Sequence, residues 1–144
     1  CIGKKGLTIN KKEGDKKTPR GLFGIGKLYY RRDRINKPET KIKFIKIKKN
    51  MGWCDDVKYP KKYNCLIETS SKVKHEKLYR SDHKYDLLIP IKYNYKKKVV
   101  GRGSCIFMHL TSNYNPTAGC IALKKKDYLI MLKLIDKNTK IRIS

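Results

Sequence analysis

The chain has 144 residues, of which 39% are hydrophobic, and its 37 Lys and Arg against 12 Asp and Glu give a formal net charge of +25. This length and composition fit a single domain over residues 1–144 that buries a core of its own. No run of 18 or more apolar residues occurs, which excludes a membrane-spanning helix.

The first half of the chain predicts short strands between irregular segments. Residues 11–26 are rich in Gly without an apolar period, so they predict a loop that leads into a strand over 26–31. In residues 41–48 the apolar positions alternate with Lys and then shift phase, which is typical of a strand with a bulge. Residues 50–64 hold the one Trp, two adjacent Asp and a Pro, and we expect them to be irregular.

The second half predicts more strands and one helix. Residues 85–91 and 104–110 are mostly apolar runs, and Pro90 marks the edge or the end of the first strand. Residues 125–136 predict an amphipathic helix, and the alternating residues 139–144 predict a last strand. The apolar positions of the helix are Tyr128, Met131, Leu132 and Ile135. The fold class is therefore mostly β, with one α-helix near the C-terminus.

The segment from His109 to Cys120 carries the clearest chemistry. An apolar run leads into His109, Gly119 directly precedes Cys120, and residues 111–118 between them predict a loop that brings the two ends together. A thiol becomes a good nucleophile when a neighbouring imidazole takes its proton. The pattern favours a cysteine enzyme of acyl transfer. The alternative is a buried structural cysteine near a hydrogen-bonded core histidine.

The pattern Thr117-x-Gly119-Cys120-Ile121-x-Leu123, with His109 upstream at the end of an apolar run, resembles the signature of the YkuD-type L,D-transpeptidases. The resemblance extends over nearly the whole chain. Its further motifs are Glu13-Gly14-Asp15-Lys16-Lys17-Thr18-Pro19-x-Gly21, Gly52-Trp53-Cys54-Asp55-Asp56, Tyr63-Asn64 and Gly101-Arg102-Gly103-Ser104-x-Ile106-Phe107-x-His109.

This resemblance implies a β-sandwich of mixed sheets with one capping helix. It also implies a peptidoglycan stem peptide as acyl donor, cut at the bond between an L-centre and D-Ala. An amine or water resolves the resulting thioester, and the residues leave that choice open. No cofactor or metal is implied, and the expected location is the periplasm or cell envelope. Because the chain opens on Cys1 rather than Met, we expect an export signal to have been removed.

In this interpretation Cys120 is the nucleophile and His109 the general base. Gly119 permits a sharp turn and close approach of the substrate, and the backbone N–H groups of Gly119 and Cys120 are the expected oxyanion donors. The following helix N-terminus and the surrounding lysines favour a thiolate. Members of the family often orient the imidazole with a backbone carbonyl, which here points to Leu110.

The chain also departs from the family pattern. Many members have Gly directly after the catalytic His and Arg two residues after the Cys, where this chain has Leu110 and Ala122. Arg102 and Arg80 are candidates to hold a substrate carboxylate in place of the missing Arg. Thr117 either forms a hydrogen bond within the turn at the substrate site or is an ordinary loop residue.

Trp53, Asp55 and Asp56 form the next candidate group. They line a cleft and meet the amine of an acceptor peptide, or Trp53 anchors its loop to the core while one Asp caps a turn. We expect the pairs His75-Glu76 and Asp82-His83 to be surface groups.

The cysteines and histidines give no metal-binding pattern. The five cysteines lie at positions 1, 54, 65, 105 and 120, without a Cys-x-x-Cys, and the three histidines show no zinc-ligand spacing with them. In an oxidising compartment a disulfide between Cys54 and Cys65 is conceivable, but the spacing does not fix it.

Two other functions stay open. A cell-wall cysteine peptidase or amidase uses the same residue types, although most cysteine peptidases place the Cys before the His. A non-enzymatic basic module that binds nucleic acid or an anionic envelope polymer is the second alternative. The lysines are dispersed along the chain, which favours solvated faces with non-specific polyanion binding over a dedicated patch.

Overall fold

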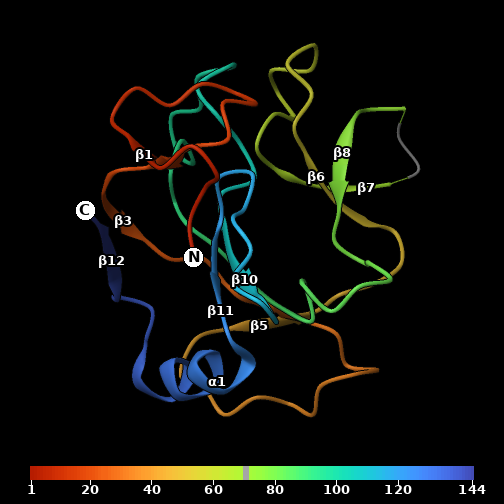
Figure 1. The fold of residues 1–144 in the computed structure, drawn as a ribbon. Helices are drawn as coiled ribbons and strands as arrows, with labels where there is room; N and C mark the ends of the chain where they lie inside the picture. Colours follow the sequence, from red (N-terminus) through yellow and green to blue (C-terminus); the bar gives the residue numbers. More distant parts are fainter. Residues whose placement is uncertain (70–71) are drawn as a thin grey trace.

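The computed structural model describes residues 1–69 and 72–144, and within these ranges it contains four small sheets and one helix (Figure 1). The class predicted from the sequence, mostly β in mixed sheets with a helix near the C-terminus, is confirmed.

The largest sheet has five strands and forms the middle of the molecule. Its strands are β4 (Leu28–Tyr30), β5 (Phe44–Lys46), β9 (Leu87–Pro90), β10 (Phe107–Leu110) and β11 (Ile121–Leu123). Their order is β11-β10-β9-β4-β5, with β9 antiparallel to β10 and β4, and with parallel pairs at both ends. Because β9 and β10 are buried along their whole length, their sequences are nearly continuous apolar runs.

Two clusters of buried side chains cover opposite faces of this sheet. Met108 of β10 belongs to the cluster that contains residues of helix α1 (Lys125–Leu134), and Phe107 belongs to the cluster that contains Trp53. Successive side chains along a strand point to opposite faces. His109 therefore lies on the face of Phe107, away from the helix.

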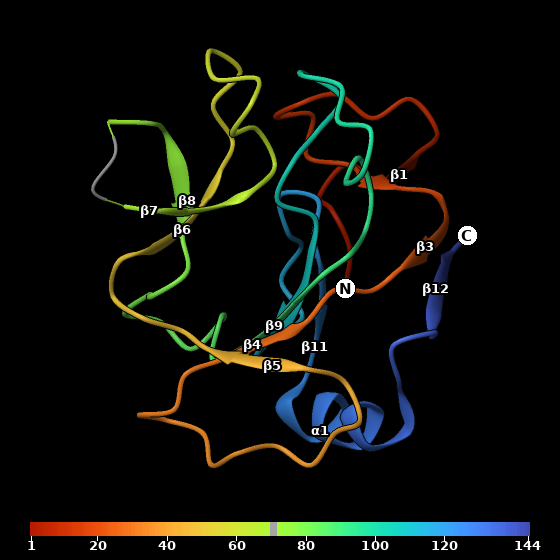
Figure 2. The same ribbon diagram turned by 180° about the vertical axis from the view of Figure 1, so that it is seen from behind.

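The three smaller sheets surround this centre. They are formed by β1 (Leu7–Thr8) with β2 (Thr18–Pro19), by β3 (Gly21–Gly24) with β12 (Lys140–Ile143), and by β6 (Met51–Cys54) between β7 (Leu66–Glu68) and β8 (His75–Lys77). Figures 1 and 2 show that the β6–β8 sheet and the β3–β12 pair lie on opposite sides of the molecule.

The helix and the strands predicted after residue 26 are found, whereas two predicted irregular segments are wrong in part. Residues 11–26 contain β2 and β3, and residues 50–64 contain β6. Gly52 is unusual within a strand. A Cβ at this position of β6 would lie 2.5 Å from the ring of His75 on β8, so only glycine fits here.

Candidate active site

One cavity of about 780 Å³ contains both His109 and Cys120 in its wall. His109 belongs to β10, and Cys120 directly precedes β11. These strands are parallel neighbours in which Met108 pairs with Ile121 and His109 with Ala122. The parallel pairing places His109 two residues further along the strands than Cys120, whose Sγ lies beside the Phe107 N–H, while the 111–118 segment runs back from the end of β10 to the start of β11.

The imidazole of His109 is held in one tautomer. Its Nδ1 lies 2.9 Å from the carbonyl oxygen of Leu110, and since a carbonyl only accepts, Nδ1 carries the proton. Nε2 is then the unprotonated nitrogen. The residue is 6% exposed, its ring meets Tyr85 edge-on at 5.3 Å, and burial lowers the pKa of His109 below its usual value. The histidine is therefore a neutral proton acceptor, with the orienting carbonyl at the residue expected.

The thiol of Cys120 lies between two backbone groups. The Phe107 N–H donates to Sγ at 3.4 Å, and the thiol donates to the carbonyl oxygen of Cys105 at 3.2 Å. Burial raises the pKa of Cys120 to about 12 and outweighs the bond from Phe107, which lowers it. The expectation of a favoured thiolate is therefore wrong for the resting protein, because desolvation dominates over the positive charges nearby.

The turn before Cys120 depends on Gly119. Its φ is +139°, and a Cβ there would lie 2.8 Å from the carbonyl oxygen of Lys17, so a side chain would clash with backbone. Thr18 Oγ1 donates to the Gly119 carbonyl at 2.9 Å, which ties the motif around Thr18 to the turn.

Thr117 takes part in the same turn through its hydroxyl. Oγ1 donates to the Cys120 carbonyl at 2.6 Å and accepts from the Gly119 N–H at 3.1 Å. The Gly119 N–H is thus already used. Within residues 1–69 and 72–144, no hydrogen-bond partner is found for the Cys120 N–H, which leaves it as the donor for an incoming oxygen.

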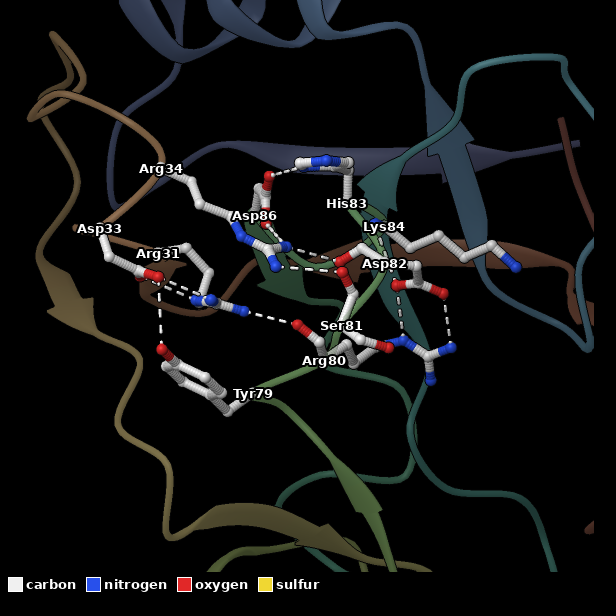
Figure 3. Close-up of polar contacts among 10 residues, drawn as sticks. All are labelled: Arg31, Asp33, Arg34, Tyr79, Arg80, Ser81, Asp82, His83, Lys84 and Asp86. Carbon is white, nitrogen blue, oxygen red and sulfur yellow. Dashed lines mark hydrogen bonds and ion pairs between the residues drawn. The ribbon is translucent and has the colours of Figure 1, made fainter.

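A second wall of the cavity is formed by the segment 80–86, of which every residue but Ser81 lines the cavity, and two arginines hold this segment in place (Figure 3). Arg31 donates to the carbonyl of Arg80 at 2.6 Å, and Arg34 donates to the carbonyls of Ser81 and Asp82 at 3.0 and 2.9 Å. Charge-assisted bonds to three successive carbonyls fix the backbone of this wall.

Arg80 lies in the cavity wall between two carboxylates. Its Nε and Nη2 donate to both oxygens of Asp82 at 2.9 and 2.7 Å, and its Nη1 donates to Glu76 at 2.9 Å. The guanidinium also lies 5.0 Å from the ring centre of Tyr85. Glu76 and Asp82 are partly exposed, as expected of surface groups, and both also line the cavity. The available sequence signal was the pair of acids four residues before and two residues after Arg80.

The other predicted substrate residues lie elsewhere. Trp53 is 2% exposed and its indole donates to Asn64 Oδ1 at 2.9 Å. Asp55 pairs with Lys74, and Asp56 accepts the N–H of Lys58 at 3.0 Å, which is the anchoring and turn-capping arrangement.

Arg102 is exposed and also lies outside the cavity. Of the predicted substrate residues, only Thr117 and the candidate Arg80 line it. Contacts of Arg102, Trp53, Asp55 and Asp56 with substrate stay predictions.

The structure gives no group of three or more His, Cys, Asp or Glu side chains suited to a metal ion within the described residues. No described helix is long and apolar enough to span a membrane. All five cysteines are free thiols, although the Cys54 N–H donates to the Cys65 carbonyl at 2.9 Å.

Comparison with known protein families gives a match over residues 1–143 to YkuD, the L,D-transpeptidase catalytic domain. No curated protein and no solved structure matches the chain.

Proposed function

The chain belongs to the YkuD family of L,D-transpeptidase catalytic domains, and from this we propose that it is a cysteine-dependent L,D-transpeptidase acting on peptidoglycan stem peptides. Cys120 is the nucleophile and His109 the general base. The observation that carries the proposal is that one cavity holds both residues, with the proton of His109 fixed on Nδ1 by Leu110.

The first half of the reaction forms a thioester. Sγ of Cys120 attacks the carbonyl carbon of the bond between an L-centre and D-Ala, and its proton moves to Nε2 of His109 as the S–C bond forms. The C–N bond then breaks, and His109 gives the proton to the nitrogen of the leaving D-Ala. Because Cys120 rests as a thiol and His109 as a neutral imidazole, proton transfer accompanies the attack.

The second half transfers the acyl group. The amine of an acceptor stem peptide attacks the thioester carbon, its proton passes to Nε2 of His109, and the S–C bond breaks as Sγ takes the proton back. Water in place of the amine gives carboxypeptidation. The Cys120 N–H supports the oxyanion in both halves, and one such donor contributes about 3 kcal/mol in acyl-transfer enzymes.

The wall of residues 80–86 holds the stem peptide. Three acids, Glu76, Asp82 and Asp86, and three bases, Arg80, Lys84 and Lys125, line the cavity, so it is close to neutral in a molecule of net charge +25. A stem peptide presents both carboxylates and amines, which suits such a surface. Arg80 serves as the carboxylate contact in the absence of an Arg at Ala122, through the guanidinium N–H groups that its bonds to Asp82 and Glu76 leave unused. The site of action is the cell envelope, where peptidoglycan lies.

The proposal is tested by intact-mass spectrometry after incubation with a carbapenem, on the wild type and on Cys120→Ala. We expect a gain of one drug molecule on the wild type and none on the variant. Cys65→Ala, which removes another partly exposed thiol outside the cavity, should keep the adduct.

A second assay uses a stem tetrapeptide with and without an amine acceptor. Release of D-Ala with a joined peptide supports transpeptidation, and release without it supports carboxypeptidation. A wild type that takes up no drug and releases no D-Ala would overturn the proposal, and a different cut in the peptidoglycan would indicate a peptidase or amidase.

A further inference from the structure

The motif around Trp53 and Asn64 does not line the cavity, yet hydrogen bonds connect it to Cys120 through a single residue. The contact passes through Cys105, whose carbonyl accepts the Cys120 thiol at 3.2 Å and whose N–H donates to Asn64 Oδ1 at 3.2 Å. Cys105 is thus held on both sides, by Asn64 at its N–H and by Cys120 at its carbonyl.

The backbone of Cys105 adopts a conformation that needs such support. Its φ is +52°, in the left-handed region that residues other than Gly rarely occupy. Asn64 also has a φ of +52°, which Asn tolerates better than most residues. One hydrogen bond therefore joins two residues with left-handed backbones, and the second of them, Cys105, contacts the Cys120 thiol. Backbone strain of this kind persists only where the surrounding structure fixes it.

Asn64 is itself fully constrained. It is 6% exposed, its Oδ1 accepts from both the Trp53 indole and the Cys105 N–H, and its Nδ2 donates to the carbonyls of Tyr93 and Asn94 at 3.3 and 2.8 Å. A buried amide with both oxygen and nitrogen satisfied has one orientation.

The segment that contains Cys105 is also held one residue earlier. Ser104 Oγ donates to Glu13 at 2.7 Å, and the Tyr63 hydroxyl donates to the same carboxylate oxygen. The second attachment is thus to Glu13, whose carboxylate Tyr63 also binds, so the Tyr63-Asn64 motif reaches Ser104 through Glu13 and Cys105 directly.

We propose that Asn64 is a positioning residue for the nucleophile: by holding the Cys105 N–H, it fixes the Cys105 carbonyl against the Cys120 thiol. The thiol thereby keeps its proton and a defined place in the cavity wall until it turns to His109. This role rests on the proposed function of Cys120, which it extends to a residue outside the cavity.

The test compares Asn64→Gly with the wild type by following alkylation of Cys120 with iodoacetamide against pH, resolved by peptide mass spectrometry. Glycine accepts the left-handed backbone but removes the amide. We expect the alkylation rate of Cys120 at pH 8 to rise about 2- to 10-fold, the range that one net hydrogen bond contributes. Acylation by the carbapenem should slow by a similar factor because Sγ is held less firmly.

Asn94→Gly is the matched control. Asn94 has a φ of +47° and side-chain bonds to the backbone of Val99 and Gly103, but none to Cys105, and glycine keeps the Asn94 carbonyl that accepts from Asn64. This substitution should leave the alkylation profile of Cys120 unchanged.

Opposite changes in alkylation and acylation are the signature of positioning. An unchanged alkylation profile in Asn64→Gly would overturn the inference, as would equal gains at Cys120 and the buried Cys54, which would indicate general opening of the fold. Failure of the wild type to take up the carbapenem would refute the proposed function instead, while the alkylation profiles would still decide the role of Asn64.

Discussion

The segments 109–120 and 52–64 both belong to motifs, but only the first contributes residues to the cavity wall. The first forms the front of the site, where His109 and Cys120 line the cavity. The second forms the back, where Trp53 and Asn64 are buried and reach Cys105 by hydrogen bonds. Both carry the resemblance to the same family, so membership of a family motif does not by itself indicate a place in the cavity wall.

The difference lies in how polar groups are satisfied. On the front, the Nε2 of His109 and the N–H of Cys120 remain available to a substrate, since the described contacts use Nδ1 of the histidine and leave that N–H without a partner. On the back, Asn64 uses its oxygen and its nitrogen within the protein. A group that binds or reacts with a substrate needs a donor or acceptor that the protein does not use, whereas a group that supports the backbone uses its donors and acceptors within the protein.

The largest expected effect comes from His109→Gln at the front. Glutamine can donate to the Leu110 carbonyl but cannot accept and return the thiol proton. Since general acid–base catalysis contributes about 100-fold or more, we expect the rate of carbapenem acylation to fall by at least that factor. Stopped-flow absorbance or time-resolved intact mass measures it.

His75→Gln is the matched control for this variant. His75 also places Nδ1 against a backbone carbonyl, that of Val73 at 2.7 Å, but it lies outside the cavity. Its substitution should leave the acylation rate within about twofold of the wild type. A similar loss of acylation rate in both variants would contradict the specific role of His109 in proton transfer.

The next effect is the pH dependence of acylation. His109 acts when neutral, and its pKa is lowered below the usual 6.5 by burial. The rate should therefore stay level down to about pH 6.5 and fall about tenfold per pH unit once the pH drops below the folded pKa. Cys120, whose pKa is raised to about 12, should react with iodoacetamide ever faster as the pH rises through 10.

The same measurement distinguishes a neutral pair from an ion pair. A preformed thiolate–imidazolium pair would give an alkylation rate that is level between about pH 5 and 8. Such a plateau would contradict the resting state described for Cys120 and His109.

Much of the fold could be predicted from the spacing of apolar residues, because a pattern that is sustained over several residues indicates helix or strand reliably. The helix over 125–136 and the strands around 85–91 and 104–110 are of this kind. Strand β6 was missed because its four residues form a strand only by pairing with β7 and β8, and neither partner has a clear alternating pattern.

The candidate site likewise has parts that could be predicted from the sequence and parts that could not. The sequence predicted that the segment from His109 to Cys120 folds back, and the pairing of β10 with β11 places His109 beside Ala122, two residues after Cys120. The wall of residues 80–86 could not be predicted, because Arg31 and Arg34 bind its backbone carbonyls from 47 to 49 residues away, and carbonyls have no sequence signal. The thiol pKa was misjudged because charge is visible in a sequence and burial is not.

The smallest effect on Cys120 is expected from Trp53→Phe at the back. Phenylalanine removes the indole N–H that donates to Asn64 Oδ1 at 2.9 Å but leaves the bond from the Cys105 N–H to the same oxygen. The free energy of unfolding should fall by about 1–3 kcal/mol from the lost hydrogen bond and the smaller ring, as urea denaturation would measure. The alkylation rate of Cys120 should change by less than about twofold, because Asn64 still fixes Cys105. A larger change than in Asn64→Gly would mean that ring packing, rather than the amide of Asn64, supports the nucleophile from behind.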